Sequence, residues 1–150
     1  MSYIDNNLMS GETVVAKARI HWFIYAPAVA LILISLTTPH YGLDPIGAIC
    51  FIIGLAMLAR AVLERVATEL GVTNKRVIAK HGLIVRNTIE LNLNRVESLS
   101  VDQSIMGRIF DFGTVTVNGT GTAHAPFRFI SQPLQFRRTV NEQVEQTTRS

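Results

Sequence analysis

The strongest constraint on this chain is a long stretch that is almost without charge. Between Arg19 and Arg60 the one formally charged residue is Asp44. The stretch contains two apolar runs, residues 20–36 and 46–59, and neither run shows a polar face. A chain of 150 residues could not readily cover two helices that are apolar on every side. A soluble core hairpin is therefore disfavoured.

The lengths of the two runs favour a membrane. With the apolar residues beside it, each approaches the roughly 17 to 25 residues that a helix needs to cross the hydrocarbon core. A helix satisfies its own backbone hydrogen bonds in lipid, so two closely linked spans form a hairpin. A signal peptide is the alternative, but a polar segment precedes the first run and no small-residue cleavage site ends it. The sequence predicts a transmembrane hairpin over residues 20–63, with spans at about 20–37 and 45–63.

Basic residues predict the orientation of this hairpin. Lys17 and Arg19 precede the first span, and Arg60 and Arg65 lie at the end of the second. The segment between the spans contains no Lys or Arg. By the positive-inside rule, we expect both termini in the cytoplasm and the connecting segment outside.

The overall composition limits the other function classes. A net charge of +3 is too small to indicate a nucleic-acid partner, and none is expected. A single cysteine excludes a disulfide framework and any site with several cysteine ligands. Only 17% of the residues are charged, against about 25% in soluble proteins, and the two spans account for this low value.

Beyond Arg65 the pattern changes to short strands and turns. The predicted strands are residues 66–73, 76–80, 83–93, 95–103, 113–121 and 126–130. A short helical turn or compact loop is expected at 104–113, and Pro133 opens an amphipathic C-terminal helix. This order predicts a small β-sandwich or partly open barrel over residues 66–147, capped by the helix. Residues 1–19 are expected to form a cytoplasmic N-terminal segment whose last part is a short strand or helix.

Several motifs of the chain are similar to those of a known family. They are TNKRVI (73–78), HGLI (81–84), ELNLNRVESLSVDQS (90–104) and GRIFDFGTVTV (107–117). In this order they resemble the bacterial membrane-flanked domain, also called the bacterial pleckstrin-homology-like (PH) domain. The resemblance implies a curved antiparallel β-sandwich with a C-terminal helix, tethered to the bacterial cytoplasmic membrane by two transmembrane helices. It implies no catalytic residue and no cofactor.

Two functions remain open at this point. The first is a non-catalytic interaction or scaffolding module, which binds a peptide or a second copy along a sheet edge. A homo-oligomer, or a complex with other membrane proteins, is expected in that case. The second is a module that binds anionic lipid head groups. Its candidate contacts are Lys75, Arg76, Lys80 and Arg86, because each basic side chain near an anionic leaflet gains about 1 kcal/mol. An ordinary solvated surface is the alternative for these residues.

The remaining polar residues do not predict an enzyme. His21, His40, His81 and His124 show no metal-ligand spacing. The central acids of the domain are Glu90, Glu97, Asp102 and Asp111, and nothing in the sequence places a nucleophile beside them. We expect Glu97 and Arg95 to face solvent. Asp102, Asp111 and Ser104 are expected to form turns and caps around the short helical segment.

Overall fold

A computed structural model describes residues 3–37, 44–82, 87–119 and 125–149 of the chain. The chain divides into two compact units, which we treat separately. Residues 22–66 form a helical unit, and residues 1–21 together with 67–150 form a β domain.

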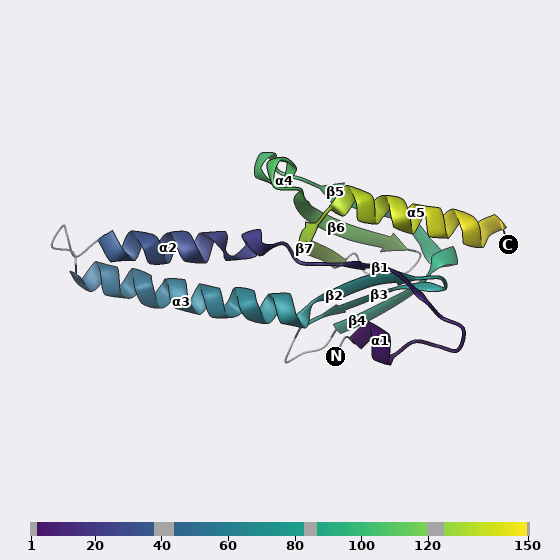
Figure 1. Cartoon of the computed structure of the whole chain (residues 1–150), viewed down its shortest axis with the longest axis horizontal. Helices are drawn as coiled ribbons and strands as arrows, with labels where there is room; N and C mark the ends of the chain where they lie inside the picture. Colours follow the sequence, from purple (N-terminus) through teal and green to yellow (C-terminus); the bar gives the residue numbers. More distant parts are fainter. Residues whose placement is uncertain (1–2, 38–43, 83–86, 120–124, 150) are drawn as a thin grey trace. The chain divides into compact units, whose positions relative to one another are not determined.

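The helical unit contains two apolar helices that lie side by side (Figure 1). Its elements, in chain order, are η1 (Trp22–Tyr25), α2 (Ala26–Thr37) and α3 (Asp44–Ala67). Among the described residues, one helix, Pro45–Ala67, is long and apolar enough to cross a membrane, with a mean hydropathy of 2.4. The apolar helix Trp22–Thr37 is shorter, at roughly 24 Å for a rise of about 1.5 Å per residue. Two full-length spans are therefore not confirmed.

A glycine allows the two helices to approach closely. A Cβ atom built on Gly54 of α3 would lie 2.7 Å from Cγ1 of Ile32 and 3.3 Å from its backbone nitrogen. These distances leave no room for a side chain without movement of α2. The absence of a side chain at Gly54 therefore allows α3 to pack closely against α2.

The β domain consists of two antiparallel sheets with a helix at its C-terminus. The first sheet has the strand order β1 (Val14–Ala18), β2 (Glu69–Thr73), β3 (Arg76–His81) and β4 (Asn87–Asn92). The second has the order β5 (Val96–Asp102), β6 (Phe112–Gly119) and β7 (Ala125–Ser131). The helical elements of the domain are α1 (Tyr3–Asn6), η3 (Leu93–Arg95), α4 (Ile105–Ile109) and α5 (Pro133–Arg149).

The N-terminal segment belongs to the β domain, which revises the predicted boundaries. Strand β1 pairs with β2 in an antiparallel register that places Ala18 opposite Leu70. The whole helical unit is thus inserted between two neighbouring strands of one sheet. Residues 1–19 were predicted as a separate segment because the strand that pairs with β1 lies more than 50 positions away in the sequence. A local strand pattern does not indicate which distant strand it pairs with.

The same part of the chain joins the two sheets. Ile20 forms an antiparallel bridge with Ile130, and Ser131 donates its N–H to the carbonyl of Arg19 over 2.8 Å. The N–H of His21 donates to the carbonyl of Phe129 over 2.6 Å. The predicted first span began at residue 20. The first apolar helix of the structure begins at Trp22, because Ile20 and His21 hydrogen-bond within the β domain.

The core forms between the sheets and α5. In β6 the buried side chains of Val115 and Val117 alternate with the half-buried polar ones of Thr114, Thr116 and Asn118, as expected for a strand with one face in a core. Helix α5 buries Phe136 and Val140 against this core, one turn apart. The predicted β-sandwich with a helical cap is confirmed in outline.

Candidate functional site

Arg76, one of the four predicted lipid contacts, is buried. Only 6% of its side chain is exposed. Its Nε and Nη2 atoms each donate to a carboxylate oxygen of Glu12 over 2.9 Å, and Nη1 donates to Oε2 of Glu90 over 2.6 Å. A guanidinium held by two carboxylates inside the domain cannot reach a lipid surface. The structure therefore corrects this prediction.

Glu12 is the central partner of this ion cluster, and its side chain is fully buried. Burial works to raise the pKa of the carboxyl. Hydrogen bonds from Arg76, from the N–H of Met9 and from the hydroxyl of Thr73 outweigh it and hold the pKa below its ordinary value of 4.5. The hydrogen bond to Glu12 raises the pKa of Arg76, against the opposing effect of burial. Both groups are therefore charged at neutral pH.

The other predicted lipid contacts lie at different places. Lys75 follows β2 in the turn to β3, and its Nζ donates to the carbonyl of Ser10 over 2.8 Å. Lys80 pairs with Glu69 in the β2–β3 register, at the other end of the hairpin, and its Nζ lies 4.9 Å from the centre of the Tyr3 ring. Arg86 lies outside the described residues. The described residues among them do not form one basic patch.

The strand register distinguishes two ends of the β domain. We call the first the exit end, because the chain leaves and re-enters the domain there; it consists of residues 19–21, 67–69, 102–104, 112–114 and 128–131. We call the second the turn end. It consists of residues 9–13 and 74–75, which are joined by hydrogen bonds from Asn74 to Thr13 and Gly11.

The four basic residues that were predicted to set the membrane orientation are all exposed, and two of them contact a neighbouring side chain. Lys17 in β1 forms a 2.6 Å ion pair with Asp5. The guanidinium of Arg65, near the end of α3, lies 5.6 Å from the centre of the Tyr25 ring in the same helical unit. Arg19 and Arg60 are exposed. The orientation itself stays a prediction.

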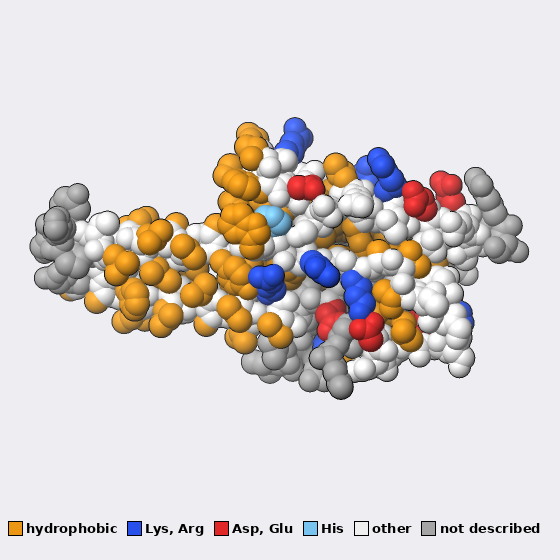
Figure 2. Space-filling model, in the orientation of Figure 1, with side chains coloured by type: hydrophobic (Ala, Val, Ile, Leu, Met, Phe, Trp, Pro, Cys, Tyr) orange, Lys and Arg blue, Asp and Glu red, His pale blue; other side chains and the backbone are white. Residues whose placement is uncertain are grey.

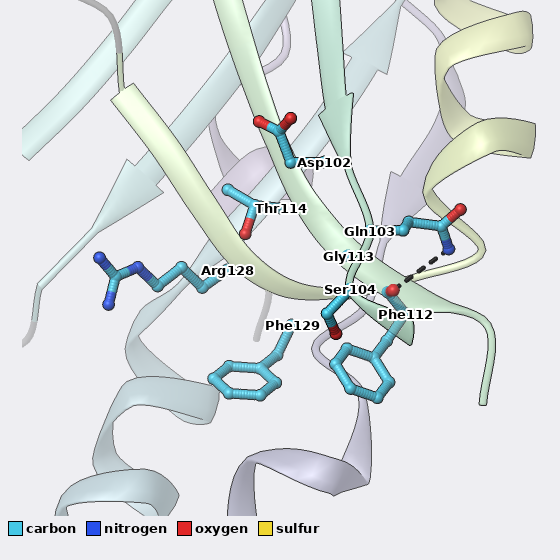
Figure 3. Close-up of a pocket in the computed structure, with 8 residues that line it drawn as sticks. All are labelled: Asp102, Gln103, Ser104, Phe112, Gly113, Thr114, Arg128 and Phe129. Carbon is cyan, nitrogen blue, oxygen red and sulfur yellow. Dashed lines mark hydrogen bonds between the residues drawn. The ribbon is translucent and has the colours of Figure 1, made fainter. Parts of the chain in front are cut away.

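A pocket of about 460 Å³ lies at the exit end (Figure 3). It is lined by Asp102, Gln103, Ser104, Phe112, Gly113, Thr114, Arg128 and Phe129. The rings of Phe112 and Phe129 stack with their centres 5.7 Å apart. Asp102 and Arg128 contribute one charge of each sign. An aromatic wall with one cation and one anion suits a peptide or a zwitterionic group better than a strongly anionic ligand.

The pocket wall is fixed by hydrogen bonds around α4. The hydroxyl of Ser104 accepts from the N–H of Gly107 over 3.1 Å and caps the helix. The side-chain amide of Gln103 donates to the carbonyl of Phe112 over 3.1 Å, as the dashed line in Figure 3 shows. The predicted capping role of Ser104 is confirmed. Asp111 adopts a left-handed φ of 55°, which confirms its predicted position in a turn.

The described part of the chain contains no metal-binding cluster. No group of three or more His, Cys, Asp or Glu side chains there could hold a metal ion. Glu90 is a partner of Arg76, whereas Glu97 and Arg95 are exposed as predicted. His21 stacks on Phe112 with ring centres 5.3 Å apart, at the point where the chain leaves the domain.

The sequence reasoning missed two features. The first is the Glu12–Arg76 cluster, although Arg76 lies in the TNKRVI motif that carries the family resemblance. The second is a group of exposed apolar side chains on α4, among them Ile105 and Ile109. The signal for it was the apolar spacing within residues 105–109, which is equally typical of a helix that is buried in the core.

Comparison with known proteins identifies the family. The sequence matches the family described as "Bacterial PH domain" over residues 14–144, which is most of the chain. This chain belongs to the bacterial PH domain family. The match begins at β1 and ends in α5, so it includes the inserted helical unit. No curated protein matches the chain.

One solved structure is similar to the PH domain of this chain. It is the crystal structure of a DUF1696 family protein with a pleckstrin-homology domain from Shewanella loihica PV-4. The identity is 10%, the TM-score is 0.43, and the match covers 53% of this chain and 73% of the other.

Proposed function

We propose that this protein is a PH domain anchored in the bacterial cytoplasmic membrane, where it acts as a non-catalytic interaction module. The observation that supports the anchor is the insertion of the apolar helical unit between β1 and β2. Because the chain leaves and re-enters the domain at one end, the PH domain is held by two connections. Two connections restrict its rotation more than a single tether does.

The short first helix is compatible with this anchor. A helix of roughly 24 Å is shorter than the hydrocarbon core of about 30 Å, and local thinning of the bilayer compensates for such a mismatch at modest cost. Its longer neighbour, Pro45–Ala67, is long and apolar enough to span the core without such an adjustment. Lys17, Arg19, Arg60 and Arg65 favour a cytoplasmic PH domain.

Cysteine labelling tests the anchor and its orientation. In a Cys50→Ser background, Tyr41→Cys places a thiol between the two helices and Asn141→Cys places one on exposed α5. A maleimide that does not cross membranes should label position 41 in intact cells, and position 141 only after lysis. Labelling of position 141 in intact cells, or recovery of the protein without membranes, would contradict the proposal.

The open edge of β5 is the best candidate for the interaction. Among the described residues, β5 pairs on one side with β6 and is not paired with β4, although β4 precedes it in the chain. The seven-residue strand β5 is thus an edge strand of its sheet, and an edge strand can pair with an added strand. The edge leads at Asp102 into the pocket of the exit end. A peptide or a second copy that pairs with β5 would therefore place side chains in this pocket.

Site-specific photocrosslinking tests this edge. A photoreactive residue in place of Ser100, exposed in the middle of β5, should form adducts with a second copy or a partner protein. The same residue at Asn141, exposed on α5, is the control and should form none. A protein that is always recovered alone and monomeric, with no adduct from position 100, would argue strongly against the interaction function.

Lipid binding remains the second candidate function, and we propose the exit end as its location. The β2–β3 turn with Lys75 lies at the turn end of the domain, whereas Arg19, Lys80 and Arg128 lie at or next to the exit end. A domain tethered at its exit end presents these three cations to the membrane surface. If the replacement of Lys75 alone abolished binding to anionic vesicles, this location would be wrong.

A further inference from the structure

Helix α4 carries a compact group of exposed apolar side chains. The exposed fractions are 79% for Ile105, 47% for Met106 and 67% for Ile109. Figure 2 shows hydrophobic side chains gathered over α4. Isolated apolar residues on a surface need no explanation, but three within five residues form a patch that indicates a binding surface.

The exposure of this patch is built into the fold. Gly107, between Met106 and Arg108, is the buried residue of α4, and a Cβ atom there would lie 2.5 Å from the carbonyl oxygen of Phe112. Ser104 and Gln103 hold the backbone of the helix through hydrogen bonds to Gly107. The helix is therefore fastened to β6 by its glycine, and its longer side chains project from the domain.

The position of α4 in the domain indicates what binds its exposed apolar side chains. Phe112 lies three positions after the end of α4, and its ring stacks on that of His21. The residue after His21 is Trp22, which begins the apolar helical unit. The patch thus lies at the exit end, beside the point where the chain leaves the domain. In an anchored protein, the nearest apolar phase at this point is the bilayer. Helix α4 itself carries Arg108, which is exposed, and no acidic residue.

We propose that α4 is a third membrane contact, which inserts Ile105, Met106 and Ile109 into the interfacial layer of the bilayer. This inference rests on the proposed anchor. Apolar side chains next to a basic one are typical of segments that lie in the membrane interface, where the cation is near the lipid phosphates. A third contact, besides the two connections to the helical unit, would further restrict the rotation of the PH domain on the membrane.

Depth-dependent quenching in proteoliposomes tests the proposal. The full-length protein is reconstituted into vesicles of phosphatidylethanolamine and phosphatidylglycerol, some of which contain brominated lipid. In a Cys50→Ser background, Met106→Cys carries an environment-sensitive fluorophore. The matched control is Met9→Cys at the turn end, where the methionine is 58% exposed. Brominated lipid should reduce the emission of the label at position 106 about twofold or more, and should leave position 9 unchanged.

A label on the native Cys50 of α3 separates this inference from the anchor. Quenching at Cys50 but not at position 106 would overturn the inference and leave the anchor intact. Absence of quenching at both positions would overturn both. A label at position 106 that is shielded from water yet not quenched by lipid indicates a second copy or a partner protein, and also overturns the inference.

Polar substitutions provide a second measurement. Because Ile105 and Ile109 are exposed, Ile105→Ser with Ile109→Ser leaves the core of the domain unchanged. This double variant should lose the quenching at position 106, whereas Met9→Ser should retain it. Full quenching in the double variant would contradict a role for these side chains.

Discussion

At the scale of single residues, the buried Glu12–Arg76 pair has the clearest energetic consequence. Glu12→Gln leaves the guanidinium of Arg76 inside the domain with one carboxylate, Glu90, which is partly exposed. Removal of one partner of a buried ion pair costs about 3 to 5 kcal/mol, and the remaining carboxylate favours the lower end of this range. We expect the free energy of unfolding to fall by about 3 kcal/mol in chemical denaturation of the detergent-solubilised protein.

A surface ion pair in the same region provides the control. Lys17 and Asp5 form a 2.6 Å pair, but their side chains are 37% and 52% exposed. Solvent screens such a pair, so Asp5→Asn should cost at most about 1 kcal/mol. Equal losses in the two variants would show that the burial of Glu12 has no energetic consequence.

The lowered pKa of Glu12 predicts a dependence of stability on pH. Below its ordinary value of 4.5, the unfolded state binds more protons at this group than the folded state does. The stabilisation is therefore complete above pH 4.5 and decreases as the pH falls through the lower pKa of the folded state. Arg76 stays charged throughout. In thermal melts from pH 7 to pH 3, the melting temperature should fall more steeply for the unsubstituted protein than for Glu12→Gln. Parallel curves of melting temperature against pH would contradict this.

Arg76 also shows that residue type and sequence neighbours do not determine whether a charged side chain is buried. The sequence places it beside Lys75 in a short turn, where two basic residues are typical of a solvated surface. Its burial depends on Glu12, which lies on the other side of the helical unit in the sequence, and on Glu90 in β4. The sequence shows which charges exist, whereas the partner of each charge depends on strand pairing.

At the scale of elements, the contact of α2 with α3 depends on Gly54. A side chain at this position would collide with Ile32 at its backbone and at Cγ1. We expect Gly54→Val to weaken the helix pair and to lower the midpoint of thermal aggregation in detergent. Ala56→Val, two positions along on the exposed face of the same helix, is the control. If the two variants behave alike, the close helix contact does not stabilise the unit.

Element prediction from the sequence worked best where the pattern was strong. The β2–β3 turn and the alternating strand β6 were predicted within a few residues, because turn residues and period-two alternation are local signals. The predicted amphipathic C-terminal helix is present as α5, which buries Phe136 and Val140 and leaves Leu134 exposed. The start of the first helix was misplaced because Ile20 is apolar enough for a membrane but forms a bridge to Ile130.

At the scale of the whole molecule, the inserted helical unit predicts which fragments can fold. Residues 67–150 lack β1, so β2 loses one of its two strand partners and the core loses Ile4 and Ile20. Residues 1–21 joined to 67–150 by a flexible glycine–serine linker retain both sheets. The linked chain should unfold cooperatively in urea, and the truncated chain should not. Cooperative unfolding of residues 67–150 with equal stability would show that β1 is dispensable.

The sequence by itself determined the existence of the apolar helices, the approximate strands and the family. These features follow from composition, periodicity and motifs, which are properties of neighbouring residues. The tertiary structure decided that β1 completes the sheet across the helical unit, that Arg76 is buried and that α4 exposes its apolar side chains. Each of these facts depends on which distant segments meet, because pairing and burial are set by the packing of the whole domain rather than by the residues near each position.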